Sequence, residues 1–545
     1  MFGTFLSPLA LGFAGLRLLL AVAIGVGAWA LFKNPRPRAA LALVLGVNLV
    51  AALAMFVPLQ RPYALGEGSD RSFNLGMAAA VTNGVSPFEH TQVGFGSPEP
   101  LWNLAVAALA GFRTERVATA YAALTPLAIL AMGLLLYRAL RQDESQADAW
   151  ERVLIVFAVF GLASLSMSAR PPVLAFFVGN FLQKPQHGIG LALAAFALGM
   201  RVRGARPLPL GLVLGLLAWV FLLDWGYLLP ILFLETLRRP RAERNWRGLL
   251  TALLVSAVIA APYVLHLLRD YNPLSNERAA QHMWEDAQGL LLAVPNWSTL
   301  DLGPLLTLGI AGFLVQRKSA HPRALALTSL ALGAWLLWLL SIPAALAGFS
   351  PEPDEMHFFL RFATAASAGA ALAAGARFVE TACGWRTGQA HALALAACFP
   401  FCFAAYWDPP SMDRYYPMSR VPIRPKVRDY TDWIRANTSK RAIFVGGRTS
   451  ASFIPALSGR QVLLNEGGRL VPKDLAARKQ VERVLLTSED ADAVRAAARR
   501  YGVTHIAIDE ALEQEYGAQS FDDLARSAAC RTLLSSSAVK LLEVK

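Results

Sequence analysis

Two carboxylates, Glu67 and Asp70, lie just beyond an apolar segment that ends near residue 60. They are three positions apart, so they would face one side of a helix that begins there. A carboxylate in such a position can act as a general base that takes a proton from an acceptor hydroxyl. Asp70 is the first candidate for this base, and Glu67 is the second. The alternative interpretation is that Ser69 and Asp70 only cap the helix that follows.

Several polar residues qualify as partners that would stabilise a leaving phosphate. Arg361 opens a later apolar span, where a guanidinium can bind a phosphate through two hydrogen bonds or simply anchor the helix at the membrane surface. Lys184 and His187 form a polar patch that lines a cavity or belongs to an external turn, and Asp224 lines the same cavity or lies at a hairpin tip. The predicted substrate-binding residues are Arg71, Lys184, His187, Asp224, His357 and Arg361.

One adjacent pair, Glu89 and His90, could bind a divalent cation together with Asp70. No His and carboxylate spacing elsewhere in the sequence strengthens this prediction, and a solvated loop pair is the competing interpretation. The sequence therefore indicates no certain cofactor and leaves a divalent metal open.

The composition is that of a membrane protein. Hydrophobic residues make up 55% of the chain, charged residues make up 16%, and the mean hydropathy is +0.42. The net charge of +13 does not indicate nucleic-acid binding, because Lys and Arg occur in short links between apolar runs rather than along one polar face. Multi-pass topology explains these links better.

The apolar runs predict roughly 12 to 14 helical membrane segments. The run over residues 208–236 is long enough for two short helices and is interrupted around Asp224. Basic links are retained in the cytoplasm, which puts the 61–100 loop, the 268–303 loop, the 344–360 loop and the tail after Tyr406 on the opposite face. The predicted cytoplasmic links are Lys33–Arg38, Arg113–Arg116, Arg201–Arg206, Arg238–Arg247 and Arg317–Arg323.

The tail has a different composition and predicts a separate soluble domain. Helical patterns alternate with apolar strands at residues 442–445, 461–464, 503–508 and 539–544, an order typical of a small α/β sandwich. The expected division is a membrane domain over residues 1–407, with the external loop 61–100, and an external α/β domain over residues 408–545.

The 61–100 loop carries a motif-like order of residues. Asp70 is followed three positions later by Phe73, then by small apolar residues, by Asn83-Gly84-Val85-Ser86-Pro87-Phe88, and by Pro98-Glu99-Pro100-Leu101-Trp102. This order resembles the first external loop of GT-C superfamily membrane glycosyltransferases. Those enzymes have tyrosines where this chain has Phe73 and Phe88, and adjacent prolines where Glu99 separates two.

The resemblance implies a polytopic α-helical, GT-C-like membrane enzyme of a bacterial inner membrane, with a periplasmic C-terminal domain. Its expected reaction is an inverting transfer of a hexosyl or pentosyl group, with an Asp base, from a polyprenyl-phosphate donor to an external acceptor. The expected partners are the lipid-linked donor, membrane lipid, and a glycan, lipid or protein acceptor, with no nucleic acid. A transporter or flippase is one alternative, although no internal repeat is evident in the sequence. A non-catalytic GT-C relative is the other.

Overall fold

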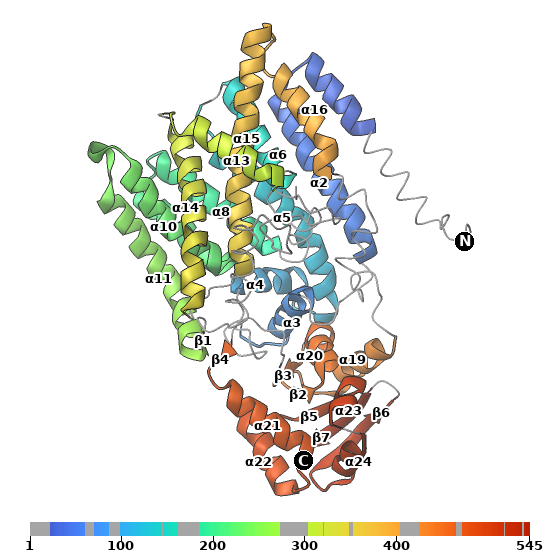
Figure 1. The fold of residues 1–545 in the computed structure, drawn as a ribbon. Coiled ribbons are helices and arrows are strands. Elements are labelled where there is room, and N and C mark those ends of the chain that lie inside the picture. The colour runs from blue at the N-terminus through green and yellow to red at the C-terminus, as the bar shows by residue number, and fades with distance from the viewer. Residues whose placement is uncertain are drawn as a thin grey trace.

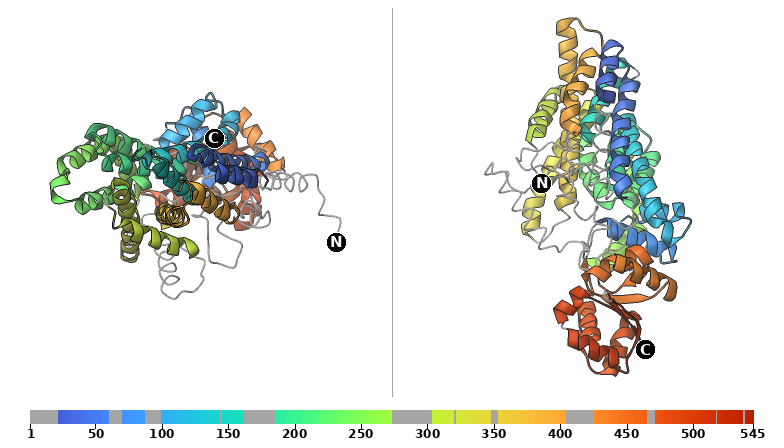
Figure 2. Two further views of the ribbon diagram at one scale, coloured as in Figure 1. Left: turned by 90° about the horizontal axis from the view of Figure 1, so that it is seen from above. Right: turned by 90° about the vertical axis from the view of Figure 1, so that its right-hand side faces the viewer.

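Apolar helices form a long bundle, and a smaller α/β unit lies at one end of it (Figures 1 and 2). The computed structural model describes residues 22–59, 70–86, 99–143, 145–161, 185–272, 303–319, 321–347, 353–403, 425–464, 471–516, 518–536 and 539–545. Four of the described helices are long and apolar enough to cross a membrane, and shorter apolar helices accompany them. The predicted class, a multi-pass α-helical membrane protein, is therefore confirmed.

The bundle begins with the helix Val22–Lys33 and continues through helices joined by short links. The helices are α2 (Pro37–Leu59), α3 (Asp70–Thr82), α4 (Pro100–Leu109), α5 (Val117–Ala139), α6 (Gln146–Phe160), α8 (Pro185–Val202), α9 (Pro207–Val220), α10 (Leu222–Arg238), α11 (Trp246–Asp270), α13 (Gly303–Gln316), α14 (Pro322–Leu346), α15 (Pro353–Cys383) and α16 (Gln389–Phe403). The 3-10 turns η1 (Thr114–Arg116) and η3 (Arg241–Glu243) lie between them.

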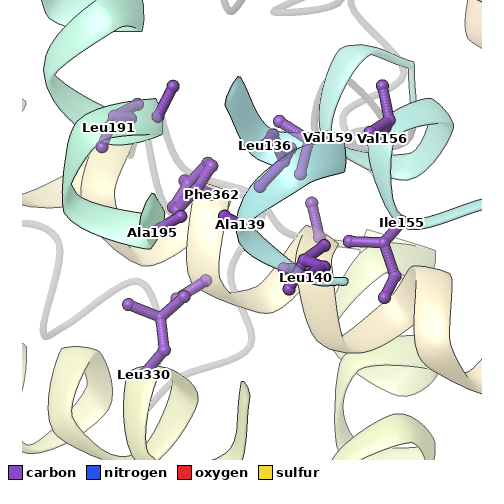
Figure 3. Packing of buried hydrophobic residues seen from close by; sticks show 14 of the residues in the cluster. Leu136, Ala139, Leu140, Ile155, Val156, Val159, Leu191, Ala195, Leu330 and Phe362 are labelled. Carbon is purple, nitrogen blue, oxygen red and sulfur yellow. The ribbon is translucent and has the colours of Figure 1, made fainter. Parts of the chain in front are cut away.

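Helix α15 is the central helix of the bundle core. It packs against α6, α13 and α14, and Figure 3 shows its Phe362 among side chains from α5, α6, α8 and α14. At Gly312 of α13 a Cβ atom would lie 1.8 Å from the carbonyl oxygen of Ser367. Only glycine permits this separation of the two helices, as is common where membrane helices pack tightly.

The C-terminal unit is a five-stranded sheet with helices on both faces. The strand order is β3-β2-β5-β7-β6, with β2 parallel to β3 and β5, and β7 antiparallel to β5 and β6. The strands are β2 (Ile443–Gly446), β3 (Gln461–Val462), β5 (His505–Asp509), β6 (Cys530–Ser535) and β7 (Val539–Val544). The helices are α19 (Pro425–Asn437), α20 (Arg448–Phe453), η5 (Ile454–Ser458), α21 (Leu475–Thr487), α22 (Ala491–Tyr501), α23 (Glu510–Tyr516) and α24 (Ala518–Arg526).

This arrangement confirms the predicted α/β class of the tail. The four predicted strands are present within a few residues, whereas β6 was not predicted. The proposed boundary between residues 407 and 408 lies outside the described residues.

Four of the five basic links meet at the end of the bundle that is far from the α/β unit (Figure 1). The amide of Gln146 donates to the Pro35 carbonyl, Arg323 donates to the Leu140 carbonyl, and Arg201 donates to the Asn245 carbonyl. Arg203 likewise donates to the carbonyl of Ala139. These contacts connect the links that contain Pro35, Arg203, Asn245 and Arg323.

The fifth link, Arg113–Arg116, lies at the other end, so the five links do not share one face as the sequence predicted. The Thr114 hydroxyl of η1 donates to Asn83 Oδ1 at 3.2 Å, and η1 contacts η5 of the C-terminal unit. The reason is the length of α4. Its 10 residues extend over about 15 Å, roughly half of the hydrocarbon core, so α4 does not carry the chain across.

Candidate functional site

Helices α3 and α4 lie between the bundle and the C-terminal unit (Figure 1). The amphipathic helix expected after the acidic pair is present, and Asp70 is its first residue. Phe73, at a position where the GT-C pattern has tyrosine, is buried and packs on Met77. Asn103 of α4 is also fully buried and approaches Met77, with 4.0 Å between Nδ2 and the sulfur. Helices α3 and α4 therefore pack against each other.

Glu99 is a buried carboxylate that sequence reasoning treated only as an interruption between two prolines. It occupies the N-cap of α4, followed by Pro100 in the first turn, and is 6% exposed. Proline suits that position because the missing N–H would have no partner within the helix. The positive end of the helix dipole favours a carboxylate there, which accounts in part for a buried acid at this position.

His187 and Asp224, predicted from two separate segments, are side by side. His187 Nε2 of α8 lies 3.5 Å from Asp224 Oδ1 of α10, and both side chains are fully buried. Neither residue is therefore at an exposed turn or hairpin tip. The predicted break in the 208–236 run is also present, because Phe221 adopts an extended conformation between α9 and α10. The break places Asp224 in the first turn of α10.

Aromatic contacts connect this pair to α15. The His187 ring stacks on Phe221 with 4.3 Å between centroids, and it meets the edge of Phe358 at 5.3 Å. Arg361 lies about one turn further along α15 and is 1% exposed. Its guanidinium keeps its positive charge at physiological pH, so it brings a cation into the same part of the bundle.

Gln186 is a residue that sequence reasoning missed. It is fully buried beside His187, and neither its amide oxygen nor its amide nitrogen has a hydrogen-bond partner in the part of the chain that the structure describes. A buried amide without partners costs about 1–3 kcal/mol, and a polar group of a ligand or a buried water at this position would satisfy it. The available signal was a polar residue between Pro185 and His187 at the start of an apolar helix.

Other predicted residues are not placed. Glu67, Lys184, Glu89 and His90 lie outside the described residues. Asp70, Arg71 and His357 belong to described helices, but their side chains are not described. Within the described ranges no group of three or more His, Cys, Asp or Glu could hold a metal ion. The metal prediction thus stays a prediction, and no step is derived through a metal.

A narrow crevice lies near the opposite end of the bundle, between α5, α8, α14 and α15. Apolar side chains such as Leu136, Leu330 and Phe362 line most of it (Figure 3). Its charged lining residues are Arg141, Arg203 and Arg323, and no carboxylate of the described ranges lines it. It therefore lacks an acid or base for group transfer, and the candidate site is the cluster around His187 and Asp224.

Solved structures of two glycosyltransferases share this architecture. The oligosaccharyltransferase of Archaeoglobus fulgidus, crystallised with zinc and sulfate, matches with a TM-score of 0.51 and 14% identity, over 89% of this chain and 70% of that one. Its apo form matches with a TM-score of 0.51 and 15% identity, over 89% and 71%. The arabinofuranosyltransferase AftD from Mycobacteria matches with a TM-score of 0.52 and 13% identity, over 92% of this chain and 40% of that one.

The chain has the GT-C fold. The fold that the residues of the 61–100 loop implied is therefore confirmed. No protein-family model and no curated protein matches the sequence. Identities of 13–15% to these GT-C structures establish the fold alone, so the activity has to be argued from the residues of this chain.

Proposed function

We propose that this GT-C protein is a membrane glycosyltransferase that transfers one sugar from a polyprenyl-phosphate donor to an external acceptor. The observation that carries the proposal is the buried cluster of Gln186, His187 and Asp224, with Arg361 one helical turn from the aromatic ring that touches His187. Ionisable groups buried among membrane helices are costly and usually serve a substrate or ion site. The GT-C fold supports the same class of reaction.

The proposed reaction is a single displacement with inversion. The acceptor hydroxyl oxygen attacks the anomeric carbon of the sugar and forms the new C–O bond. The bond from that carbon to the phosphate oxygen breaks, and polyprenyl phosphate leaves with the bonding electrons. Asp70 takes the acceptor proton as general base, with Glu67 as the second candidate.

The remaining residues bind and orient the donor. Arg361 stabilises the charge on the leaving phosphate, for which a guanidinium is well suited. The Gln186 amide offers both a donor and an acceptor to sugar hydroxyls or phosphate oxygens, and Asp224 fixes the orientation of the His187 ring. Arg71, Lys184 and His357 are further proposed contacts to the donor, and Glu89 with His90 the proposed ligands of an optional metal.

The location proposed for the enzyme is a bacterial inner membrane. The four clustered basic links would lie in the cytoplasm, which makes the opposite end, with α3, α4 and the unit from residue 408 onward, periplasmic. An external glycan, lipid or protein is then the acceptor, and a hexosyl or pentosyl group is the sugar.

The test uses the full-length protein in lipid nanodiscs with radiolabelled polyprenyl-phosphate sugars. Label should pass to an acceptor with the wild type, and D70N should abolish transfer while donor binding and folding persist. The matched control is E115Q, which neutralises an exposed carboxylate at the same end of the molecule. Full activity in D70N would refute the assigned base. Movement of intact donor across vesicles without transfer would instead favour the transporter alternative.

A further inference from the structure

The C-terminal unit shares a hydrophobic core with the helix that begins at Asp70. Leu75, Ala78 and Ala79 of α3 are buried in one cluster with Ile454 and Ala456 of η5. The same cluster continues into the sheet through side chains of β2 and β7. Helix α3 therefore has one of its apolar faces covered by the tail.

Hydrogen bonds fix the end of α3 to the same place. The Asn83 amide donates to the Gly459 carbonyl at 2.8 Å, and Thr114 donates to Asn83 Oδ1 at 3.2 Å. The hydroxyls of Thr82 and Thr114 are 2.7 Å apart. Gly459 has φ +69°, a conformation that glycine adopts without strain. This α3–tail clamp, made of Thr82, Asn83, Thr114 and Gly459, joins three distant parts of the chain.

A second attachment lies at the end of α11. The strand β1 (Tyr271–Asn272) pairs with β4 (Val471–Pro472), and Lys473 Nζ donates to the Leu268 carbonyl at 2.7 Å. The Lys473 N–H also donates to the carbonyl of Asp270 at 3.2 Å. Two attachments to different helices of the bundle define the orientation of the tail, which a single flexible linker would not do.

We infer that the C-terminal unit is a positioning element of the transfer site, which acts by holding α3 in place. The α3–tail clamp sets the position of the helix at whose start Asp70 lies, so loss of the clamp displaces the proposed base. This inference rests on the proposed function only for its effect on turnover. The effect on α3 itself is independent of any activity.

Two glycines provide a matched pair of substitutions. A Cβ atom at Gly459 would lie 2.3 Å from Asn83 Nδ2 and 3.0 Å from the Ala79 carbonyl oxygen. Gly502 has nearly the same φ, +67°, and also follows a helix of the tail. A Cβ atom at Gly502 would lie 3.7 Å from Ile443 Cδ1, which is an ordinary contact. Both G459A and G502A strain a left-handed residue of the tail, and only G459A disturbs α3.

Hydrogen exchange measured by mass spectrometry on the full chain in nanodiscs gives the first readout. G459A should increase exchange of the α3 amides by about fivefold or more, the factor expected for one lost hydrogen bond, and G502A should leave them unchanged. N83A removes the clamp from the α3 side without backbone strain and should reproduce the effect. Its control is N437A, which removes an exposed intrahelical bond of α19.

Turnover gives the second readout. G459A and N83A should lower kcat while the KM for the donor stays within about twofold, because a displaced base leaves donor contacts intact. Unchanged α3 exchange in both variants would overturn the inference. If α3 exchange rises in both variants but the wild-type protein transfers no sugar, the role of the clamp in holding α3 is supported and the proposed function is refuted.

Discussion

Gly190 of α8 permits a close approach between the two helices that carry His187 and Asp224. A Cβ atom there would lie 2.5 Å from Asp224 Oδ2 and 2.8 Å from Phe221 Cβ. Ordinary contacts between carbon atoms are about 3.5–4.0 Å, so G190A must push α8 and the start of α10 apart by about 1 Å. We therefore expect G190A to separate His187 from Asp224.

We expect G190A to lower both the stability of the fold and the turnover. Overpacking of this kind destabilises a protein by about 1–3 kcal/mol, which should appear as a lower thermal transition of the purified protein. A 1 Å displacement of positioned groups can reduce turnover by about 10²-fold, so the loss of activity should be much larger than the loss of folded protein.

The assay is transfer of labelled sugar per folded molecule, measured beside G226A. Gly226 lies in the same α10 segment and is exposed, and apart from its neighbours and the backbone of its own helix no described atom lies within 4 Å of an added Cβ. G226A should keep turnover within about twofold of the wild type, because it adds a methyl group to open space and raises helix propensity. Wild-type turnover in folded G190A, or an equal loss in G226A, would refute the reasoning.

Two further predictions concern the buried amide and the topology. Q186L removes an unsatisfied amide at nearly constant volume, so the thermal transition should rise by the equivalent of about 1–3 kcal/mol while donor affinity falls; unchanged donor affinity would contradict a ligand role for Gln186. In a background without native cysteines, R116C and S439C should react with an impermeant maleimide from the same face of the membrane, and R244C from the opposite face. Labelling of R116C together with R244C would contradict the position of η1 next to Asn83.

Local sequence patterns predicted much of the architecture. Apolar periodicity predicted the helix that begins at Asp70, and apolar runs predicted strands that lie in the C-terminal sheet. The length of the 208–236 run predicted two helices interrupted around Asp224, and the structure has the break three residues earlier, at Phe221. Each of these features is specified by neighbouring residues. The likeness of the 61–100 loop to GT-C enzymes predicted the fold that the solved structures share.

The features that the sequence did not predict depend on contacts between residues far apart in the chain, or on the length of a helix, which the charge of the neighbouring link does not indicate. The link at Arg113–Arg116 is as basic as the four links at the opposite end, and only the short α4 before it shows that the chain has not crossed. Asn83 bonds to a residue 376 positions away, and no pattern near either residue indicates the partner. The only local signal for Gln186 was its polar side chain at the start of an apolar helix, because its buried environment is formed by tertiary packing.

The two attachments of the C-terminal unit also bear on the transporter alternative. Alternating access requires one part of a helical bundle to rock against another around the substrate site. Here the C-terminal unit is joined both to α3 and η1 and to the end of α11, two separate parts of the bundle. Rocking of those parts would break the Asn83–Gly459 bond or the β1–β4 pairing in every cycle. A transferase needs the opposite property, catalytic groups held within about 0.5 Å, and a doubly attached tail is suited to that requirement.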